Sequence, residues 1–107
     1  MANNYKNSKV DLANTDVTTL YTAPSATQAI IKSLLVSNDS GSADTITVTI
    51  TDSAAAVFSV YKNEEVGALS TKELLSQPLI IMESEILKVT AASANRLHVV
   101  ASYLEIT

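Results

Sequence analysis

The sequence predicts an all-β protein that folds as a single antiparallel β-sandwich, jelly-roll-like, with about seven or eight strands. Thirty of the 107 residues are Val, Ile or Thr, the β-branched types that favour strands. Short apolar stretches recur from Val10 onward and are separated by Asn, Asp, Ser and Gly, as strands and turns are in sandwiches and barrels. The chain lacks the alternation of strands and amphipathic helices that is typical of a parallel sheet.

The first nine residues are polar and rich in Asn, so we expect residues 1–9 to form a flexible N-terminal arm. The sandwich domain is expected over residues 10–107. Its first clear strand covers residues 18–23 and ends at Pro24, which has no N–H to donate to a strand ladder. Residues 28–37 form the next strand and are apolar at most positions.

The most regular strand pattern covers residues 45–51, where Ile46, Val48 and Ile50 alternate with four threonines. A period of two gives this strand one apolar face and one face of hydroxyl groups. Residues 38–42 are turn-forming types, so this strand and residues 28–37 are predicted to be neighbouring antiparallel strands.

Residues 70–75 fit two structures. Ser70 and Glu73 have the spacing of a helical capping box, but the run is short and Pro78 closes it, so we favour an edge strand. The remaining strands are predicted from short apolar runs at residues 57–61, 79–82, 86–91 and 96–106.

Composition argues against several classes of function. Without Cys the chain has no disulfide, thiol nucleophile or thiolate metal site. The net charge is −4 and the seven basic residues are scattered, so we expect no nucleic-acid partner. The longest apolar run, residues 54–58, is far short of the roughly 20 residues of a membrane helix. We therefore expect no membrane partner, and the polar N-terminus predicts no signal peptide.

No catalytic or metal-binding pattern is evident. His98 is the only histidine, and there is no second His or Cys to share a metal ion. Residues 38–44 are a loose version of a calcium loop without the EF-hand order of ligands, so we favour a plain turn. Motifs for a nucleophilic Ser or a phosphate loop are absent, so we expect no enzyme and no cofactor, with a small hydrolase using His98 as the alternative. Three acid pairs fall in turns or at strand ends: Asp39 and Asp44, Glu64 and Glu65, Glu83 and Glu85.

Two predicted strands, residues 28–37 and 96–106, carry aliphatic side chains on both faces. In a two-layer sandwich the outer face of each strand meets water and should be polar. The second apolar face therefore needs a cover, either another segment of this chain or another subunit. We expect self-association as a dimer or trimer through Ile31, Leu35, Val100, Leu104 and Ile106.

Four segments follow one another in a recognisable order: Leu20-Tyr21-Thr22-Ala23-Pro24, Ala29-Ile30-Ile31-Lys32-Ser33-Leu34, Val36-Ser37-Asn38 and Thr45-Ile46-Thr47-Val48. This order resembles the small β-sandwich virion proteins of tailed bacteriophages, and residues 101–106 are similar to their usual terminal strand. The resemblance spans about residues 17–106. It departs at Ser84-Glu85, where such proteins often have a Gly-Asp turn.

The resemblance implies a non-enzymatic structural protein of a bacteriophage virion, assembled in the host cytoplasm. The preferred role is capsid decoration (a cement protein), in which copies bridge major capsid subunits and oppose the pressure of packaged DNA. Its partners would be further copies of itself and the major capsid protein. The alternatives are a neck, tail or baseplate accessory, a fibre-attachment protein, or a surface- or carbohydrate-binding module. The last would need either an acid-lined cation site or exposed aromatic side chains, for which the tyrosines are Tyr5, Tyr21, Tyr61 and Tyr103.

Overall fold

The computed structural model describes residues 3–107, and within this range the chain forms nine strands and no helix. The predicted all-β fold is confirmed, with nine strands in place of seven or eight. In chain order the strands are β1 (Asn3–Asp11), β2 (Thr18–Thr22), β3 (Gln28–Asn38), β4 (Asp44–Thr51), β5 (Val57–Val66), β6 (Ser70–Glu73), β7 (Leu79–Ile81), β8 (Ile86–Ala91) and β9 (Leu97–Ile106).

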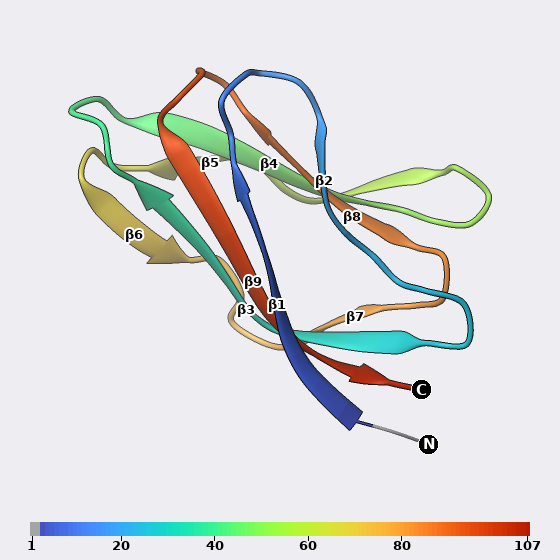
Figure 1. Cartoon of the computed structure of the whole chain (residues 1–107). Coiled ribbons are helices and arrows are strands. Elements are labelled where there is room, and N and C mark those ends of the chain that lie inside the picture. Colours follow the sequence, from blue (N-terminus) through green and yellow to red (C-terminus); the bar gives the residue numbers. More distant parts are fainter. Residues whose placement is uncertain (1–2) are drawn as a thin grey trace.

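The strands form two antiparallel sheets that pack face to face as a sandwich (Figure 1). The five-stranded sheet has the order β1-β9-β3-β6, with β7 also paired to β3. The four-stranded sheet has the order β2-β8-β4-β5. No helix in the described residues is long and apolar enough to cross a membrane.

The predicted pairing of β3 with β4 is wrong. β3 pairs with β6, β7 and β9, whereas β4 pairs with β5 and β8 in the other sheet. The turn between them is organised by Asn38, whose side chain is buried. Its Nδ2 donates to the carbonyl oxygens of Ser42 (2.8 Å) and Val66 (3.2 Å), and its Oδ1 accepts from the Ser40 N–H (3.0 Å). The chain therefore crosses between sheets here, and the turn-forming residue types alone do not distinguish this from a hairpin.

Replacing Asn38 by alanine should lower the free energy of unfolding by about 1–2 kcal/mol, because the buried carbonyl of Val66 loses a donor. Urea denaturation followed by far-UV circular dichroism measures the loss. Asn7→Ala on the exposed part of β1 is the matched control and should change stability by less than about 0.5 kcal/mol. Equal losses in the two variants would show that Asn38 does not hold the turn.

The N-terminal segment belongs to the five-stranded sheet. β1 pairs with β9 without a shift, from Asn3 opposite Ile106 to Asp11 opposite His98. Residues 1–9 were expected to be an arm outside the sandwich because they are polar, but this polarity suits an edge strand with little cover. Of that predicted arm, Met1 and Ala2 lie outside the described residues.

A bulge in β3 changes which side chains face the core. The ladder with β9 shifts between Ile31 and Ser33. Ala29 and Ile31 face inward before the shift, and Leu34 and Val36 face inward after it, all with no exposed surface. The aliphatic residues that were predicted on both faces of this strand therefore lie mostly on one face.

Residues 70–73 form the predicted edge strand, β6. The side chain of its last residue, Glu73, forms hydrogen bonds with the residues of the β3 bulge. Its carboxylate accepts the Leu34 N–H at 2.7 Å and the Leu75 N–H at 3.2 Å, and also the Ser33 hydroxyl. Burial acts to raise the pKa of Glu73, but these hydrogen bonds together hold that pKa below its ordinary value. The acid that suggested a helix cap instead ties β6 to β3.

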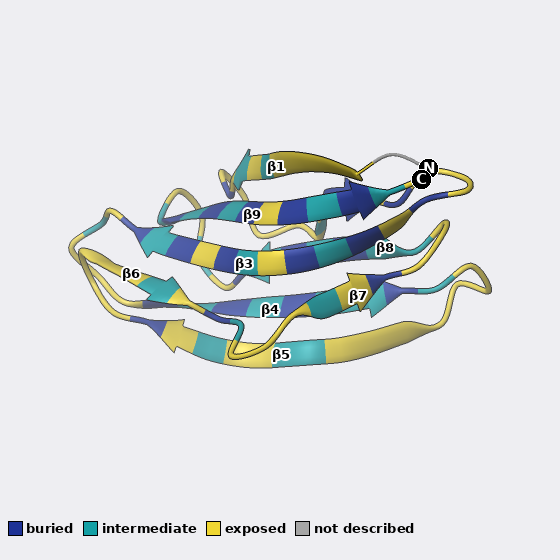
Figure 2. Ribbon diagram, turned by 90° about the horizontal axis from the view of Figure 1, so that it is seen from below, coloured by how far each residue is buried: buried dark blue, intermediate teal, exposed yellow. Residues whose placement is uncertain are grey.

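The core lies between the sheets. Figure 2 shows buried and less buried residues alternating along β3 and β9, beside a mostly exposed β1. On β4 the predicted alternation holds for Ile46 and Val48, which have no exposed surface, whereas Ile50 is only partly buried. The largest fully buried side chains on the central strands are Ile31, Leu34, Val36, Ile46, Val48, Leu87, Val89, Leu97 and Val99.

Candidate interaction surface

The outer face of the five-stranded sheet carries a row of four apolar side chains. Strand register places Tyr5 opposite Leu104, Leu104 opposite Ile30, and Ile30 opposite Ile80. Directly opposite residues on neighbouring strands point to the same face, so this row crosses β1, β9, β3 and β7. Tyr5 is 77% exposed and Ile80 is 47% exposed, while Ile30 and Leu104 are half-buried. We call these four residues the apolar row.

Further aliphatic residues lie on the same face beside the apolar row. Leu35, 38% exposed, lies opposite Val100, and Ser33 opposite Ser102 separates this pair from the row. Ile106 follows Leu104 two residues along β9 and is half-buried. The face is therefore apolar in two bands with a polar strip between them.

Four of the five residues predicted for self-association lie on this outer face: Leu35, Val100, Leu104 and Ile106. Ile31 does not, because it precedes the β3 bulge and points into the core with no exposed surface. Its placement on an interaction surface was wrong. That the other four mediate self-association stays a prediction.

Sequence reasoning did not place the two most exposed members of the apolar row on this face. Tyr5 was assigned to the arm, and Ile80 lies in a short run of aliphatic residues that gives no alternation to follow. Exposed apolar side chains that are contiguous across strands indicate an interaction site, whereas single ones do not. Cross-strand register is the observation that brings them together.

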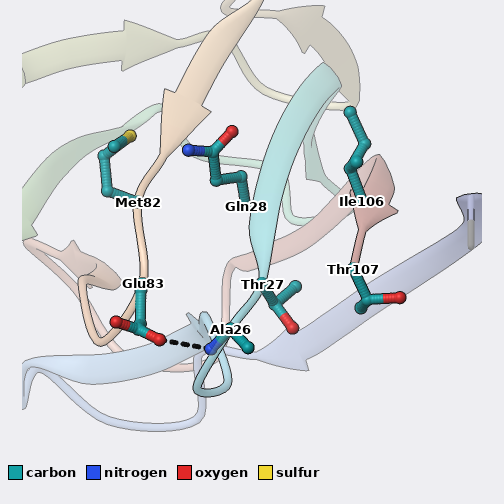
Figure 3. A pocket seen from close by; sticks show the side chains of 7 residues that line it. All are labelled: Ala26, Thr27, Gln28, Met82, Glu83, Ile106 and Thr107. Carbon is teal, nitrogen blue, oxygen red and sulfur yellow. Dashed lines mark hydrogen bonds between the residues drawn. The ribbon is translucent and has the colours of Figure 1, made fainter. Parts of the chain in front are cut away.

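One end of this face is hollowed between the β2–β3 turn, the β7–β8 turn and the end of β9 (Figure 3). The depression has a volume of about 420 Å³, and Gln28, Met82 and Ile106 are among the residues that line it. Glu83 is the only ionisable side chain in its lining, and its carboxylate accepts the Ala26 N–H. The depression therefore continues the outer face and offers no pair of acid and base.

His98 lies at the other end of the outer face, in one row with Asp11 and Ser37. Its Nε2 is 3.3 Å from Oδ1 of Asp11, and its Nδ1 is 3.7 Å from Oδ2 of Asp39. The Ser37 hydroxyl instead accepts a hydrogen bond from Thr71 at 3.4 Å. Since both imidazole nitrogens face carboxylates, neither activates Ser37 as a nucleophile. This geometry gives no support to a hydrolase.

The loop at residues 38–44 has its carboxylates turned to different partners. Asp44 accepts the Thr45 N–H at 2.8 Å and the Ser93 N–H at 3.2 Å, while Asp39 faces His98. Among residues 3–107, no group of three or more His, Asp or Glu side chains could hold a metal ion. The plain-turn interpretation of residues 38–44 stays a prediction.

Glu105 is a buried carboxylate between the two sheets, 5% exposed. Its Oε1 lies 2.8 Å from Nζ of Lys6 on β1, and its Oε2 accepts the Tyr21 hydroxyl of β2 at 2.6 Å. The hydrogen bonds from Lys6 and Tyr21 lower the pKa of Glu105, while burial raises that of Tyr21. Glu105 thus connects β9 to the edge strands β1 and β2. Sequence analysis did not single it out, because an acid near a strand end is ordinarily solvated.

The tyrosines are mostly engaged in the fold. Tyr21 and Tyr103 are buried with ring centroids 4.4 Å apart, and the Tyr103 hydroxyl is 2.9 Å from Oγ of Ser8. Tyr61 is half-buried and donates to a backbone carbonyl. Of the four tyrosines, Tyr5 alone presents an open ring, so a sugar-binding platform has little support.

Comparisons with known proteins give no family and a solved structure of low similarity. A scan against protein-family models finds no match, and a search of the curated proteins also finds none. Among solved structures, the chain is similar to one in the structure of infectious bursal disease virus, Gt strain, with 12% sequence identity and a TM-score of 0.47. The alignment covers 98% of this chain but 30% of the viral chain, so this chain spans less than a third of that length. The tailed-bacteriophage resemblance stays a prediction.

Proposed function

We propose that this chain is a non-enzymatic structural protein of a virion that acts by adhesion, as a capsid decoration protein. The observation that carries the proposal is the apolar row on the open outer face of a sheet, with the separate band of Leu35 and Val100 on the same face. Contiguous exposed apolar residues on a rigid sandwich suit binding to another protein. The resemblance to tailed-bacteriophage virion proteins supports a virion as the place where the protein acts.

The size of the molecule suits this role. It measures 45 × 26 × 22 Å. The area of one of its broad sides is therefore larger than the area that each partner buries in a specific interface, which is about 800 Å². The contacting surface would be supported by two hydrogen-bonded sheets and a packed core, so little ordering is needed on binding. In this proposal the outer face contacts a major capsid subunit. Self-association through Leu35, Val100, Leu104 and Ile106 would use the same face and is a competing proposal; a Leu104→Lys variant with a lower mass than wild type in light scattering would support it.

Particles of the virus that encodes this chain should contain it, and heads without it should release their DNA at a lower temperature. Purified protein added back should restore the release temperature. Ile80→Lys, which places a charge in the apolar row, should weaken binding to heads by about tenfold or more. Val57→Lys is the matched control, because Val57 is 62% exposed on β5 of the other sheet.

Each outcome of this experiment bears on the proposal. Equal binding of the two variants would remove the outer face as the contact surface. Density along the tail or at the neck would favour an accessory protein over a decoration protein. Particles that do not contain the chain would overturn a virion role.

A further inference from the structure

We propose that two copies of this chain pair through the free edge of β1, antiparallel about a two-fold axis at Asn7. The two five-stranded sheets would then form one continuous sheet. The pairing deepens the proposed function by saying how copies join, and its place in a virion rests on that function.

Within residues 3–107, β1 is the long edge strand that is neither shortened nor bulged; of its charged residues, Lys6 is paired with Glu105, and Lys9 is the lysine left exposed beside the free edge. Its nine residues pair with β9 without a shift, include no Pro, and have no positive φ. Natural edge strands are usually shortened, bulged, interrupted by Pro or given charged side chains to prevent pairing with another chain. The other edges here follow that rule. β6 and β7 have four and three residues, β2 has a bulge, and β5 has two register shifts and a φ of 52° at Asn63.

The hydrogen-bonding groups along this edge face outward. The Leu12 N–H donates to the Leu97 carbonyl at 3.0 Å, directly beyond the last pair of the β1–β9 ladder. In an antiparallel ladder the bonded residues alternate, so the even-numbered residues of β1 bond to β9. The odd-numbered ones direct their N–H and C=O groups away from the sheet, and of these the Asp11 carbonyl already accepts the Ala13 N–H at 2.9 Å. Residues 3–7 are all exposed, which leaves this edge open to a partner strand.

A second copy would add to this edge, because β1 is held in its own sheet by side-chain contacts. Lys6 forms its ion pair with the buried Glu105 at 2.8 Å. Ser8 lies 2.9 Å from the Tyr103 hydroxyl. A domain-swapped dimer, in which the two copies exchange β1, would have to break both contacts and form them again between copies. Pairing through the free edge of β1 leaves both contacts intact.

The length of the overlap and the charges together favour one register of the pairing. With the axis at Asn7, all nine residues of β1 pair, Tyr5 lies opposite Lys9 of the second copy, and Asn3 lies opposite its Asp11. No like charges are opposed, which favours this register. Moving the axis to Lys6 shortens the overlap and opposes two lysines. In the favoured register the apolar row of one copy lines up with the band that contains Leu35 of the other, with Lys9 between Tyr5 and Val100.

Cysteine cross-linking tests the pairing directly, because the chain contains no Cys. Asn7→Cys would place two thiols opposite each other across the axis, with about 5.5 Å between Cα atoms, a separation that a disulfide spans. Mild oxidation should give a covalent dimer of twice the 11.3 kDa chain mass. Lys32→Cys, exposed on β3, is the control and should cross-link only at background level. Cross-linking of Asn7→Cys no higher than that of the control would overturn the pairing.

Substitutions that change the charge at two exposed positions of β1 test the register. Neither side chain is part of the core. Tyr5→Lys would oppose two lysine pairs per dimer and should raise the dissociation constant several-fold in analytical ultracentrifugation. Adding Lys9→Glu to the same chain should restore the association. An unchanged constant in Tyr5→Lys, or no recovery in the double variant, would overturn this register. Far-UV circular dichroism checks that both variants keep the fold.

The two proposals fail separately. A chain that is found in virions but whose Asn7→Cys variant does not cross-link would overturn the β1 pairing and leave the virion role. A chain that pairs through β1 but is absent from particles would overturn the virion role and leave the β1 pairing.

Discussion

Replacing Ile46 by alanine should lower the free energy of unfolding by about 2–5 kcal/mol. Ile46 has no exposed surface and lies on β4, which is flanked by β5 and β8 in the four-stranded sheet. Removing three carbons from such a site loses their burial and leaves a cavity between the sheets, because the core relaxes only partly. Urea denaturation followed by far-UV circular dichroism suits a chain without Trp.

Ile50→Ala is the matched control, since it makes the same chemical change on the same strand. The sequence gives Ile46 and Ile50 equivalent positions in one alternating pattern, but Ile50 is only partly buried. Its substitution should therefore cost clearly less than that of Ile46. Equal losses, or a larger loss at Ile50, would contradict the packing of this strand.

The positions of most strands could be predicted because they depend on local pattern. Alternation at residues 45–51 and apolar runs between turn-forming residues describe single strands well. β5 was expected to end near Lys62, but it continues to Val66. As an edge strand it has solvent for its charges, and Glu64 pairs with Lys72 at 2.7 Å. Charged residues therefore did not mark the end of this strand.

The interaction surface depends on relations between strands, which local pattern does not contain. The bulge between Ile31 and Ser33 reverses which residues of β3 face inward, and this removed Ile31 from the predicted surface. The apolar row exists because register places Tyr5 and Ile80 at opposite ends of one line. A strand assignment with correct bounds would still miss both features, since neither has a signature within a single segment.

Glu105→Gln should lower the free energy of unfolding by about 2–3 kcal/mol at pH 7, because hydrogen bonds to a charged acceptor are lost. The native contacts of Glu105 are the ion pair with Lys6 on β1 and the hydroxyl of Tyr21 on β2, with Tyr103 nearby on β9. A neutral amide keeps one acceptor oxygen but turns an N–H₂ group toward one of these donors. Glu65→Gln is the matched control, because Glu65 is exposed on β5, and it should change stability by less than about 0.5 kcal/mol.

The difference between wild type and Glu105→Gln should disappear in acid. The native state holds the pKa of Glu105 below its ordinary value of 4.5, so the unfolded chain takes up the proton more readily as the pH falls. The stabilisation is complete above the unfolded pKa and is lost as the pH falls through the lower native pKa. Glu73, whose pKa is also lowered, gives both proteins a shared acid dependence that cancels in the difference. Urea denaturation from pH 7 down to pH 3 measures the two curves, and a gap that stays constant over that range would show that Glu105 is not the carboxylate that joins the edge strands to β9.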